Sequence, residues 1–507
     1  MNDENFKNTC LASALACISD ALLRPRHAAI VQRHLQLFPS EGRSELTCYY
    51  LDSIVCSQLE YIIFHDKLFL ALIETKSNKM PSISEIVNNH KPDLGAYEEL
   101  YKWFHAHPEL SFCEKETAAA IAKHLATFNA FDIHAHIGGH GLAAVLKNGT
   151  GKTVLLRADI DALPVQEQTG LEYASTKRMQ DVEGVEKPVM HACGHDMHIT
   201  ALLAAAETLV RARDAWSGTL LLVFQPAEEK GKGAQAMIDD GLYEKIPIPD
   251  VVIGAHVMPE KAGVIGTKQG LIASSADSYL LNINGRQTHA STPHRGIDPI
   301  VQAASTILRL QTIVARETDP LDFAVVTVSA MHAGDAENII PGTAELKLDI
   351  RAARPATRSR LLDSVRSIVD AEALASRNPH SPQMTQIRQF PLLFNDATVT
   401  AAIESAFHAH FNGVAKEVGV VYTPDIARLQ GSEDFGVLAT AVGRPSCFFL
   451  YGGTEERLYE RLEGEGRMDE VPGNHSPFFA PAVRPTLRVG VEGYAVSAFA
   501  FLGKVDV

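Results

Sequence analysis

Short apolar runs alternate with helical stretches between residues 94 and 255, and this alternation constrains the fold more than any other feature of the sequence. The apolar runs are bounded by turn signals, as strands are. Alternation of this kind is typical of a mostly parallel sheet with helices on both faces. The pattern predicts helices at 97–107, 114–125, 199–213 and 234–240, and strands at 154–156, 219–224 and 251–255.

A different order of elements is predicted for residues 274–388. Strand and helix patterns follow one another there as βαββαβ, the order of a compact ferredoxin-like α+β unit. After this unit, α/β character resumes and continues to the C-terminus. We therefore predict one α/β domain, made of residues 91–273 and 389–507, with the α+β unit inserted between its two segments.

Residues 1–90 form an N-terminal extension that differs from the rest of the chain. They include four of the seven cysteines and several apolar stretches with helical patterns, but no chemical motif. We predict a helical extension, whose role stays open between an appendage, a partner-binding segment and poorly ordered sequence. The odd number of cysteines and their scattered positions argue against a disulfide scaffold.

The charge of the chain excludes some classes of partner. There are 61 acidic and 46 basic side chains, so the formal net charge is −15 at pH 7. An acidic balance without a basic cluster argues against nucleic acid and anionic membranes as partners. The best candidate for a membrane span, residues 61–73, is too short and is interrupted by charged residues. An acidic rather than basic N-terminus argues against a signal peptide, so we predict a cytoplasmic protein.

Potential metal ligands and acids stand at the ends of three predicted strands. In open parallel sheets, ligands bind at the carboxyl ends of the strands. The repetition of this placement therefore indicates a site at one edge of the sheet. The residues are Asp159 and Asp161 after the first strand, Glu228 and Glu229 after the second, and His256 after the third.

The densest cluster of potential ligands is the segment MHACGHDMH at 190–198. A thiolate from Cys193 and an imidazole from His195 can reach one metal centre, and both suit transition metals. The plain alternative is a helix N-terminus capped by Asp196, with Cys193 buried as a small hydrophobe. For the cluster alone these interpretations are about equally favoured, but the acids and histidine at the strand ends favour a metal centre.

Glu228 and Glu229 are adjacent, and this has a chemical use. Neighbouring residues in an extended segment point in opposite directions. One carboxylate can therefore bind a metal while the other faces the attacking water as a general base. The plain alternative is a solvated acidic turn beside Lys230 and Lys232, which would be preferred if the pair stood alone.

Taken together, these motifs resemble those of a known family. They are similar, in the same order, to the motifs of the metallopeptidase family of aminoacylases. Within that family the likeness is to the branch of hippurate hydrolases and auxin–amino-acid conjugate hydrolases. The resemblance runs from about residue 94 to the C-terminus. The motifs that carry it are RADIDALP at 157–164, the cluster at 191–198, QPAEE at 225–229, GAHV at 254–257 and NHSP at 474–477.

The resemblance implies a dinuclear metal centre with a catalytic glutamate. Glu228 would act as base and then as acid, and Asp161 would orient a neighbouring ligand. Asp159 stands where other branches have a metal-binding histidine, and Cys193 where they have a bridging carboxylate. A thiolate favours Zn²⁺, whereas related enzymes often use Mn²⁺. The implied ligands of the two divalent ions, Zn²⁺ or Mn²⁺, are Cys193, His195, Glu229, His256 and His475.

The inserted unit carries motifs that resemble the lid domain of this family, through which its members form dimers. The resemblance implies that His289 reaches across a homodimer to polarise the substrate carbonyl, and that Asn338 and Arg351 hold the substrate. A guanidinium suits a free carboxylate because it donates two parallel hydrogen bonds. Without the resemblance, the three residues would be taken as ordinary loop, turn and strand-end residues.

The sequence therefore predicts a metal-dependent amidohydrolase that cleaves N-acyl amino acids, aromatic acyl groups included, or similar small amides. A dipeptidase or aminopeptidase on the same scaffold is an alternative, which would need an acidic partner for the free α-amino group of its substrate. A catalytically silent scaffold protein is a second alternative, opposed by the presence of every expected metal and catalytic residue. The expected partners are a small-molecule substrate and a second copy of the chain, without nucleic acid or membrane.

Overall fold

The computed structural model describes residues 81–414, 419–429 and 431–504. The chain divides into two compact units, Met1–Met80 and Pro81–Val507, and all of the described residues belong to the second. The helical structure predicted for the N-terminal extension before residue 81 lies outside the described residues.

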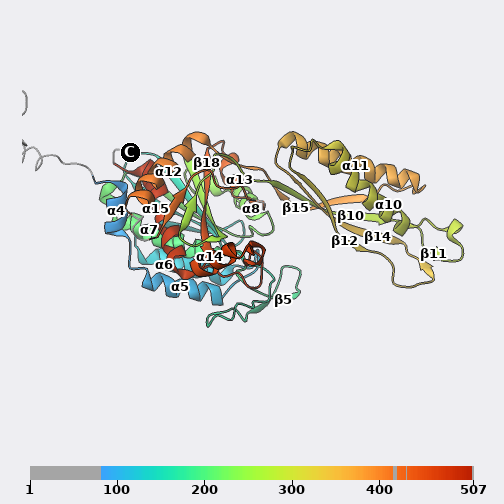
Figure 1. Ribbon diagram of the computed structural model, residues 1–507, viewed down its shortest axis with the longest axis horizontal. Coiled ribbons are helices and arrows are strands. Elements are labelled where there is room, and N and C mark those ends of the chain that lie inside the picture. Colours follow the sequence, from blue (N-terminus) through green and yellow to red (C-terminus); the bar gives the residue numbers. More distant parts are fainter. Residues whose placement is uncertain (1–80, 415–418, 430, 505–507) are drawn as a thin grey trace, which may run out of the picture. The chain divides into compact units, whose positions relative to one another are not determined.

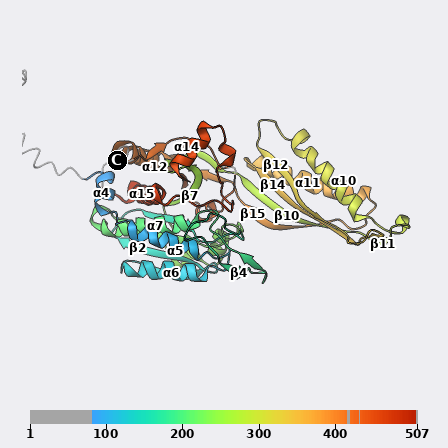
Figure 2. The ribbon, with the colours of Figure 1, turned by 60° about the horizontal axis from the view of Figure 1, so that its bottom comes forward.

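An eight-stranded sheet forms the centre of the described unit (Figures 1 and 2). In spatial order its strands are β1 (Asp132–Ile137), β2 (Gly141–Asn148), β6 (Gly218–Gln225), β3 (Thr153–Asp159), β7 (Val251–Lys261), β18 (Ser446–Thr454), β8 (Val264–Gly266) and β17 (Val421–Thr423). The inner strands β6, β3, β7 and β18 are parallel. The edge strands β1 and β2 are antiparallel to their neighbours. The prediction of a mostly parallel central sheet is confirmed.

Helices cover both faces of this sheet. On one face lie α4 (Ile83–His90), α5 (Gly95–Ala106), α6 (Lys115–Thr127), α7 (His195–Arg211), α12 (Ala397–Ala409) and α15 (Val483–Leu502); on the other lie α8 (Gly233–Asp239), α9 (Leu242–Lys245) and α13 (Gly436–Thr440). Successive side chains of a strand point to opposite faces. Val154 and Leu156 therefore pack into the first layer and Leu155 into the second. Burial on both faces explains why the strands are continuous apolar runs.

The α7 helix is buried on nearly all sides, because α15, α5 and the sheet pack around it. Its first turn follows the predicted metal loop, so a rigid, buried element fixes that loop. The longest helix of the same layer, α15, is also largely apolar. No helix among the described residues is long and apolar enough to cross a membrane.

An antiparallel four-stranded sheet with two helices forms the inserted unit, residues 275–390, which we call the lid domain (Figure 1). In chain order its main elements are β10 (Ser275–Asn284), α10 (Pro299–Thr312), β12 (Ala324–His332), β14 (Thr343–Ala352), α11 (Pro355–Ala375) and β15 (Gln383–Phe390). The strand order is β12-β14-β10-β15. Both helices pack on one face, where side chains such as Leu281, Leu346 and Leu361 form a separate hydrophobic core. The ferredoxin-like prediction is confirmed.

Short elements connect the larger ones. They are the pair β4 (Arg178–Gln180) and β5 (Glu186–Pro188), the pair β9 (Gly270–Ala273) and β16 (Leu393–Asn395), the pair β11 (Thr288–His289) and β13 (Ile339–Ile340), and the helix α14 (Glu456–Gly464). The β9–β16 pair lies where the chain enters and leaves the lid domain.

The α4 helix packs against α15 and α7 and so belongs to the core, although the sequence predicts that the N-terminal extension runs to residue 90. Lys91, at its C-terminal end, donates to the buried Glu492 of α15. Arg488 Nε also donates to Glu492, at 2.8 Å, and Nε2 of His410 lies 3.3 Å from the second carboxylate oxygen. One carboxylate thus joins three segments of the chain.

Glu492 makes the stability depend on pH in the acid range. Burial raises the pKa of its carboxyl, but the hydrogen bond from His410 and the charges of Lys91 and Arg488 outweigh burial and lower the pKa to about 2. A lowered pKa in the folded state stabilises the protein fully above the unfolded value of 4.5, and this stabilisation is lost as the pH falls toward 2. We expect Glu492→Gln to lower the free energy of unfolding by about 3 kcal/mol at pH 7. In urea titrations the difference from the wild type should shrink by about 2 kcal/mol between pH 7 and pH 3, and a constant difference would contradict this assignment.

Candidate metal centre and active site

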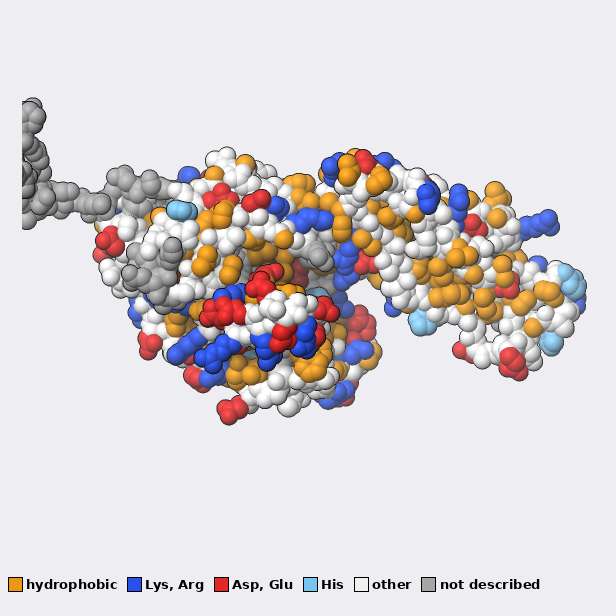
Figure 3. Space-filling model, viewed as in Figure 1, with side chains coloured by type: hydrophobic (Ala, Val, Ile, Leu, Met, Phe, Trp, Pro, Cys, Tyr) orange, Lys and Arg blue, Asp and Glu red, His pale blue; other side chains and the backbone are white. Residues whose placement is uncertain are grey.

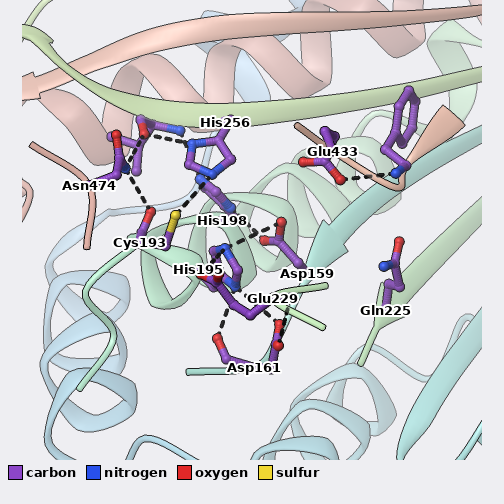
Figure 4. A network of polar contacts seen from close by, with 12 residues as sticks. Asp159, Asp161, Cys193, His195, His198, Gln225, Glu229, His256, Glu433 and Asn474 are labelled. Atoms are coloured by element: carbon purple, nitrogen blue, oxygen red, sulfur yellow. Dashed lines mark hydrogen bonds and ion pairs between the residues drawn. The ribbon is translucent and has the colours of Figure 1, made fainter. Parts of the chain in front are cut away.

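The loop before α7 brings Cys193 and His195 to the ends of strands of the central sheet. His195 begins α7, and Gly194 has a φ of 84°, in the left-handed region. A Cβ at position 194 would lie 2.4 Å from Cγ1 of Val257, so glycine is required there. Figure 4 shows the Cys193 and His195 side chains beside residues of β7 and β3.

Cys193 faces His256 of β7. The sulfur lies 3.4 Å from Nε2 of His256, and both residues are buried. The Nδ1 of His256 lies 2.7 Å from the carbonyl oxygen of Val257, so it carries the proton that it donates there. Burial holds the pKa of His256 well below its usual value. The neutral ring therefore directs the lone pair of Nε2 toward the sulfur, as a metal ligand would.

His195 is held in the same way by Asp161. Its Nδ1 donates to the carbonyl oxygen of Asp161 at 2.9 Å, and its buried Nε2 has no hydrogen-bond partner. That nitrogen lies 3.6 Å from Asp159 and 3.8 Å from Glu229. Burial alone would lower the pKa of His195, but the surrounding carboxylates outweigh burial and raise it to about 10. Charges that attract a proton to this nitrogen also attract a metal ion.

Asp161 also fixes Glu229. Its Oδ2 accepts hydrogen bonds from the Ser111 hydroxyl at 2.7 Å and from the backbone N–H of Glu229 at 3.1 Å. Asp161 therefore positions two of the predicted ligands, His195 through its backbone carbonyl and Glu229 through its carboxylate, as an orienting residue should.

His475 completes the group from the C-terminal part of the chain. Its Nε2 lies 3.4 Å from a carboxylate oxygen of Glu229, and its backbone N–H donates to Ala192 at 2.7 Å. Its φ of 71° is in the left-handed region, which is rare for a residue other than glycine and recurs at functional sites. Asn474 anchors the turn through hydrogen bonds to the carbonyls of Cys193 and Val257, both at 3.3 Å.

The five side chains together form a donor set that fits divalent cations. Ligand atoms lie within 4.8 Å of one another in three overlapping groups. Two of these atoms, Nε2 of His195 and Oε1 of Glu229, are buried without a hydrogen-bond partner in the described residues. Buried polar atoms are rarely unpaired unless something else satisfies them. Thiolate, imidazole and carboxylate are ligands of Zn²⁺ and similar ions. The groups are Cys193–His195–His256, Cys193–Glu229–His475 and His195–Glu228–Glu229.

His198 lies close to these residues, but both of its ring nitrogens are engaged. Nε2 accepts from the Val257 N–H at 2.8 Å, so Nδ1 carries the proton that it donates to Asp159 at 2.6 Å. The ring therefore orients Asp159. Burial raises the pKa of Asp159, but Arg157, His195 and His198 outweigh burial and hold it well below its usual value.

Glu228 lies next to a buried ionic cluster. Arg157 of β3 is fully buried and donates to Asp159 at 2.7 Å, Glu433 at 3.0 Å and Asp434 at 3.4 Å. Carboxylate oxygens of Glu228, Glu433 and Asp434 lie within 4.8 Å of one another. Burial raises the pKa of Glu228 well above its usual value, and the charges of Glu433, Glu229 and Asp434 raise it further. This environment favours a carboxylate that takes up a proton readily.

The role of Arg157 is absent from the sequence-based predictions, although one signal points to it. A charged residue that continues an apolar strand buried on both faces must pair with acids. The segment GSEDF at 431–435 supplies two of them, Glu433 and Asp434.

A cavity of about 910 Å³ opens onto these groups. Four predicted ligands, Cys193, Glu229, His256 and His475, line it together with Glu228. Arg351 of the lid domain, a predicted substrate-binding residue, lines the same cavity. Its guanidinium also donates to Asp349 at 3.0 Å. The volume is that of a typical small-molecule site.

The other two predicted substrate-binding residues do not line this cavity. His289 is exposed on β11, and its Nδ1 lies 2.7 Å from the Ser291 hydroxyl. Asn338 precedes β13, which pairs with β11, and its carbonyl accepts from the Ala290 N–H at 2.9 Å. The structure thus brings His289 and Asn338 close to each other at one end of the lid domain.

The fold and the site define a class of protein. Loops and strands of an α/β domain bring together a thiol, three imidazoles and a carboxylate in a donor set for divalent cations. A second carboxylate, of raised pKa, stands beside them at the wall of a cavity. These are the parts of a metal-dependent hydrolase.

Comparisons with known proteins agree with this class. The model of the peptidase family M20/M25/M40 matches residues 155–464. Hippurate hydrolase of Campylobacter jejuni is 39% identical over 372 residues, which cover 72% of this chain and 90% of that protein. IAA-amino acid hydrolase ILR1-like 5 of Arabidopsis thaliana is 29% identical over 435 residues, 84% of this chain and 92% of that protein.

A solved structure is similar throughout the same region. The Bacillus subtilis YXEP protein, described as a dinuclear metal binding peptidase from the M20 family, has a TM-score of 0.60 and 28% sequence identity, covering 80% of this chain and 98% of that one. The chain therefore belongs to the peptidase family M20/M25/M40, and the resemblance seen in its motifs is confirmed. It is a hydrolase that acts on amide bonds.

Proposed function

We propose that this hydrolase cleaves the amide bond of N-acyl amino acids. The observation that carries the proposal is the cavity, which is lined by four residues of the donor set, by Glu228 and by an arginine of the lid domain. An amide carbonyl suits the donor set, and a free carboxylate suits the arginine. The hippurate hydrolase and IAA-amino acid hydrolase relatives are named for such substrates.

In this proposal, Cys193, His195, Glu229, His256 and His475 hold two divalent metal ions. Bound there, the ions would lower the pKa of a water molecule and polarise the substrate carbonyl. The unpaired Nε2 of His195 and Oε1 of Glu229 support this assignment. The thiol of Cys193 favours Zn²⁺ over Mn²⁺ as the resident ion. Asp161 orients His195 and Glu229 through the contacts described above.

Glu228 is the proposed general base and acid. Its carboxylate takes a proton from the attacking water while the water oxygen bonds to the amide carbon. When the carbon–nitrogen bond breaks, the same carboxyl gives that proton to the departing amine nitrogen. The raised pKa suits the first step, because a carboxylate of higher pKa is a stronger base toward the attacking water.

Arg351 is the proposed anchor of the amino-acid carboxylate. It is part of a lid strand and reaches the cavity wall with its guanidinium half-buried. His289 and Asn338 are proposed to serve the cavity of a second copy of the chain, where His289 would stabilise the oxyanion. This assignment requires a homodimer.

Exposed apolar side chains of the lid domain support a homodimer. Val301, Ala304 and Leu308 form a stripe along α10, and the side chains of Val301 and Leu308 are 60% and 73% exposed. β12 is at the edge of the lid sheet, where its backbone can pair with another strand. Hydrophobic side chains also gather on the face of the lid that is visible in Figure 3.

We expect Leu308→Glu to convert a dimer into a monomer, because a charge on the apolar stripe opposes its burial against a second copy. Analytical ultracentrifugation should show the mass halved, and kcat should fall because His289 no longer reaches a second active site. Leu374→Glu, an equally exposed leucine on α11, is the matched control and should leave both unchanged. A monomeric wild type, or a dimeric and active Leu308→Glu protein, would contradict the proposal.

The function is tested by the release of amino acids from N-acetyl, N-benzoyl and indole-acyl amino acids, with free dipeptides alongside. We expect release from the acylated substrates after loading with Zn²⁺ or Mn²⁺, and loss of activity with a chelator. Cleavage of dipeptides alone would replace the proposal with a peptidase. No cleavage by a folded, metal-loaded protein would overturn it.

A further inference from the structure

The wall of the cavity away from the donor set carries three arginines, Arg351, Arg388 and Arg428. Only one carboxylate, that of the amino acid, is assigned to this wall in the proposed function. Three guanidiniums are more positive charge than one carboxylate needs, since a single arginine can hold a carboxylate with two hydrogen bonds.

Arg351 and Arg388 project from the same face of the lid sheet. Ala276 of β10 pairs with Arg351 on one side and with Phe390 on the other, so these three residues form one row. Arg388 is two residues from Phe390 and therefore points to the same face. This face is opposite the one that α10 and α11 cover, because Ile350 and Ala352, the neighbours of Arg351, pack into the lid core. The two guanidiniums thus face the cavity from adjacent rows.

Arg428 lines the cavity near Phe323, which precedes β12, the lid strand at the opposite edge of the sheet from β15. Arg428 is next to Leu429, whose N–H donates to the carbonyl of Ile272 just before β10. Its guanidinium stacks on Phe323, with Cζ 4.2 Å from the ring centroid. Nη1 is buried and has no hydrogen-bond partner among the described residues. A buried donor on a charged group is costly unless a ligand satisfies it.

Arg388 and Arg428 make no ion pair with a described residue, whereas Arg351 is paired with Asp349. The acids of the cavity are engaged elsewhere. Glu228 and Glu229 belong to the metal end, and Glu433 is paired with Arg157. Glu260 accepts from the Tyr459 hydroxyl at 2.9 Å. The surplus positive charge is therefore available to a ligand.

We propose that the substrate carries a second carboxylate, on the side chain of its amino acid, and that Arg388 and Arg428 bind it. The preferred substrates are then N-acyl derivatives of glutamate or aspartate. The second charge belongs to the amino-acid half because Arg388 lies one row from Arg351, the proposed anchor of the α-carboxylate. This inference rests on the proposed function and specifies its substrate class.

The test compares substrates that differ only in charge. N-acetyl-glutamate and N-acetyl-glutamine have nearly the same shape, and the metal-loaded protein should prefer the first by about 30-fold or more in kcat/KM, because the neutral amide leaves the charges of Arg388 and Arg428 unpaired. N-succinyl-glutamine carries its second carboxylate on the acyl group instead. The kcat/KM for N-succinyl-glutamine should be no higher than that for N-acetyl-glutamine.

Two variants test the residues separately. Arg388→Gln and Arg428→Gln should each reduce kcat/KM for N-acetyl-glutamate by about 30-fold, mainly through a higher KM, and change that for N-acetyl-glutamine by less than about 3-fold. Arg360→Gln removes an exposed arginine from α11 and should change neither. Circular dichroism checks that the variants are folded, and Arg388, with no buried unpaired atom, keeps the test valid if the Arg428 variant unfolds.

The outcomes separate this inference from the function on which it rests. If N-acetyl-glutamine is cleaved as well as N-acetyl-glutamate or better, the proposal of a second carboxylate is wrong, but the proposed amidohydrolase activity still stands. If N-succinyl-glutamine is preferred to N-acetyl-glutamine, the second carboxylate belongs to the acyl group and its placement on the amino acid is wrong. If both variants lose kcat/KM equally for N-acetyl-glutamate and N-acetyl-glutamine, the arginines support the structure of the cavity and not the choice of substrate. Cleavage of no acyl amino acid at all would overturn the proposed function itself.

Discussion

Glu228→Gln should lower kcat by about 10²- to 10⁴-fold, the usual contribution of a general acid–base. Glutamine has nearly the same shape but cannot take a proton from the attacking water or return it to the amine. Since the five donor residues are unchanged, the metal content should stay that of the wild type. Single-turnover hydrolysis of the best N-acyl amino acid, together with metal analysis by mass spectrometry, measures both quantities.

Glu260→Gln is the matched control, because Glu260 lines the same cavity but lies outside the three donor groups. It should retain kcat within a few-fold of the wild type. A Glu228→Gln protein that keeps wild-type turnover would remove Glu228 from the mechanism. A variant that loses its metal along with its activity would instead indicate that Glu228 acts as a ligand.

The main parts of the candidate site can be predicted from sequence because they follow strands of a parallel sheet. Asp159 ends β3, Glu228 follows β6, and β6 and β7 flank β3 in the sheet. His256 lies within β7, which continues to Lys261 instead of ending at residue 255 as the sequence predicts. The topology still brings the three residues together. The cluster at the start of α7 is recognisable in the sequence because a cysteine and a histidine, Cys193 and His195, are only two positions apart. His475 is different, since only its motif indicates it. Its left-handed backbone and its contact with Glu229 depend on a turn that no periodicity shows.

The unpredicted residues make contacts across long stretches of chain. Arg157 meets Glu433, which is 276 positions away, and sequence spacing holds no trace of such a pairing. Arg428 lies in an irregular loop, and its place at the cavity follows from the way that loop packs against the base of the lid. The order of the lid strands follows from the βαββαβ pattern, but the exposed stripe on α10 emerges only once the buried face of that helix is known.

Arg157→Met should lower the free energy of unfolding by about 3–5 kcal/mol, the usual cost of removing one partner from a buried ion pair. Methionine fills similar apolar space but removes the guanidinium from Glu433 and Asp434 and leaves Asp159 with only its histidine contacts. Denaturant titration at pH 7 measures the loss. Arg461→Met, which removes an exposed arginine from α14, should change stability by less than about 0.5 kcal/mol.

The pH dependence distinguishes lost charge from lost packing. Burial, with the charge of Glu433, already raises the pKa of Asp434 to about 7 despite the opposing effect of Arg157. Without Arg157 the pKa of these carboxyls rises further. A carboxyl whose folded pKa lies above its unfolded value favours the folded state at low pH and opposes it as the pH rises through the folded pKa. The variant should therefore lose less stability at pH 5 than at pH 8.

Neutralising the acidic partners of Arg157 should restore part of the stability that Arg157→Met loses. In the triple variant Arg157→Met, Glu433→Gln and Asp434→Asn, two of the three carboxylates that lose the guanidinium are neutralised, so part of the lost stability should return. The two amide substitutions alone, in the presence of Arg157, should destabilise the protein because they leave the guanidinium with a single acid, Asp159. This opposite response to the same substitutions is the signature of an energetic coupling. If the losses simply add and do not depend on pH, Arg157 stabilises the fold through packing, and the cluster beside Glu228 has no electrostatic role.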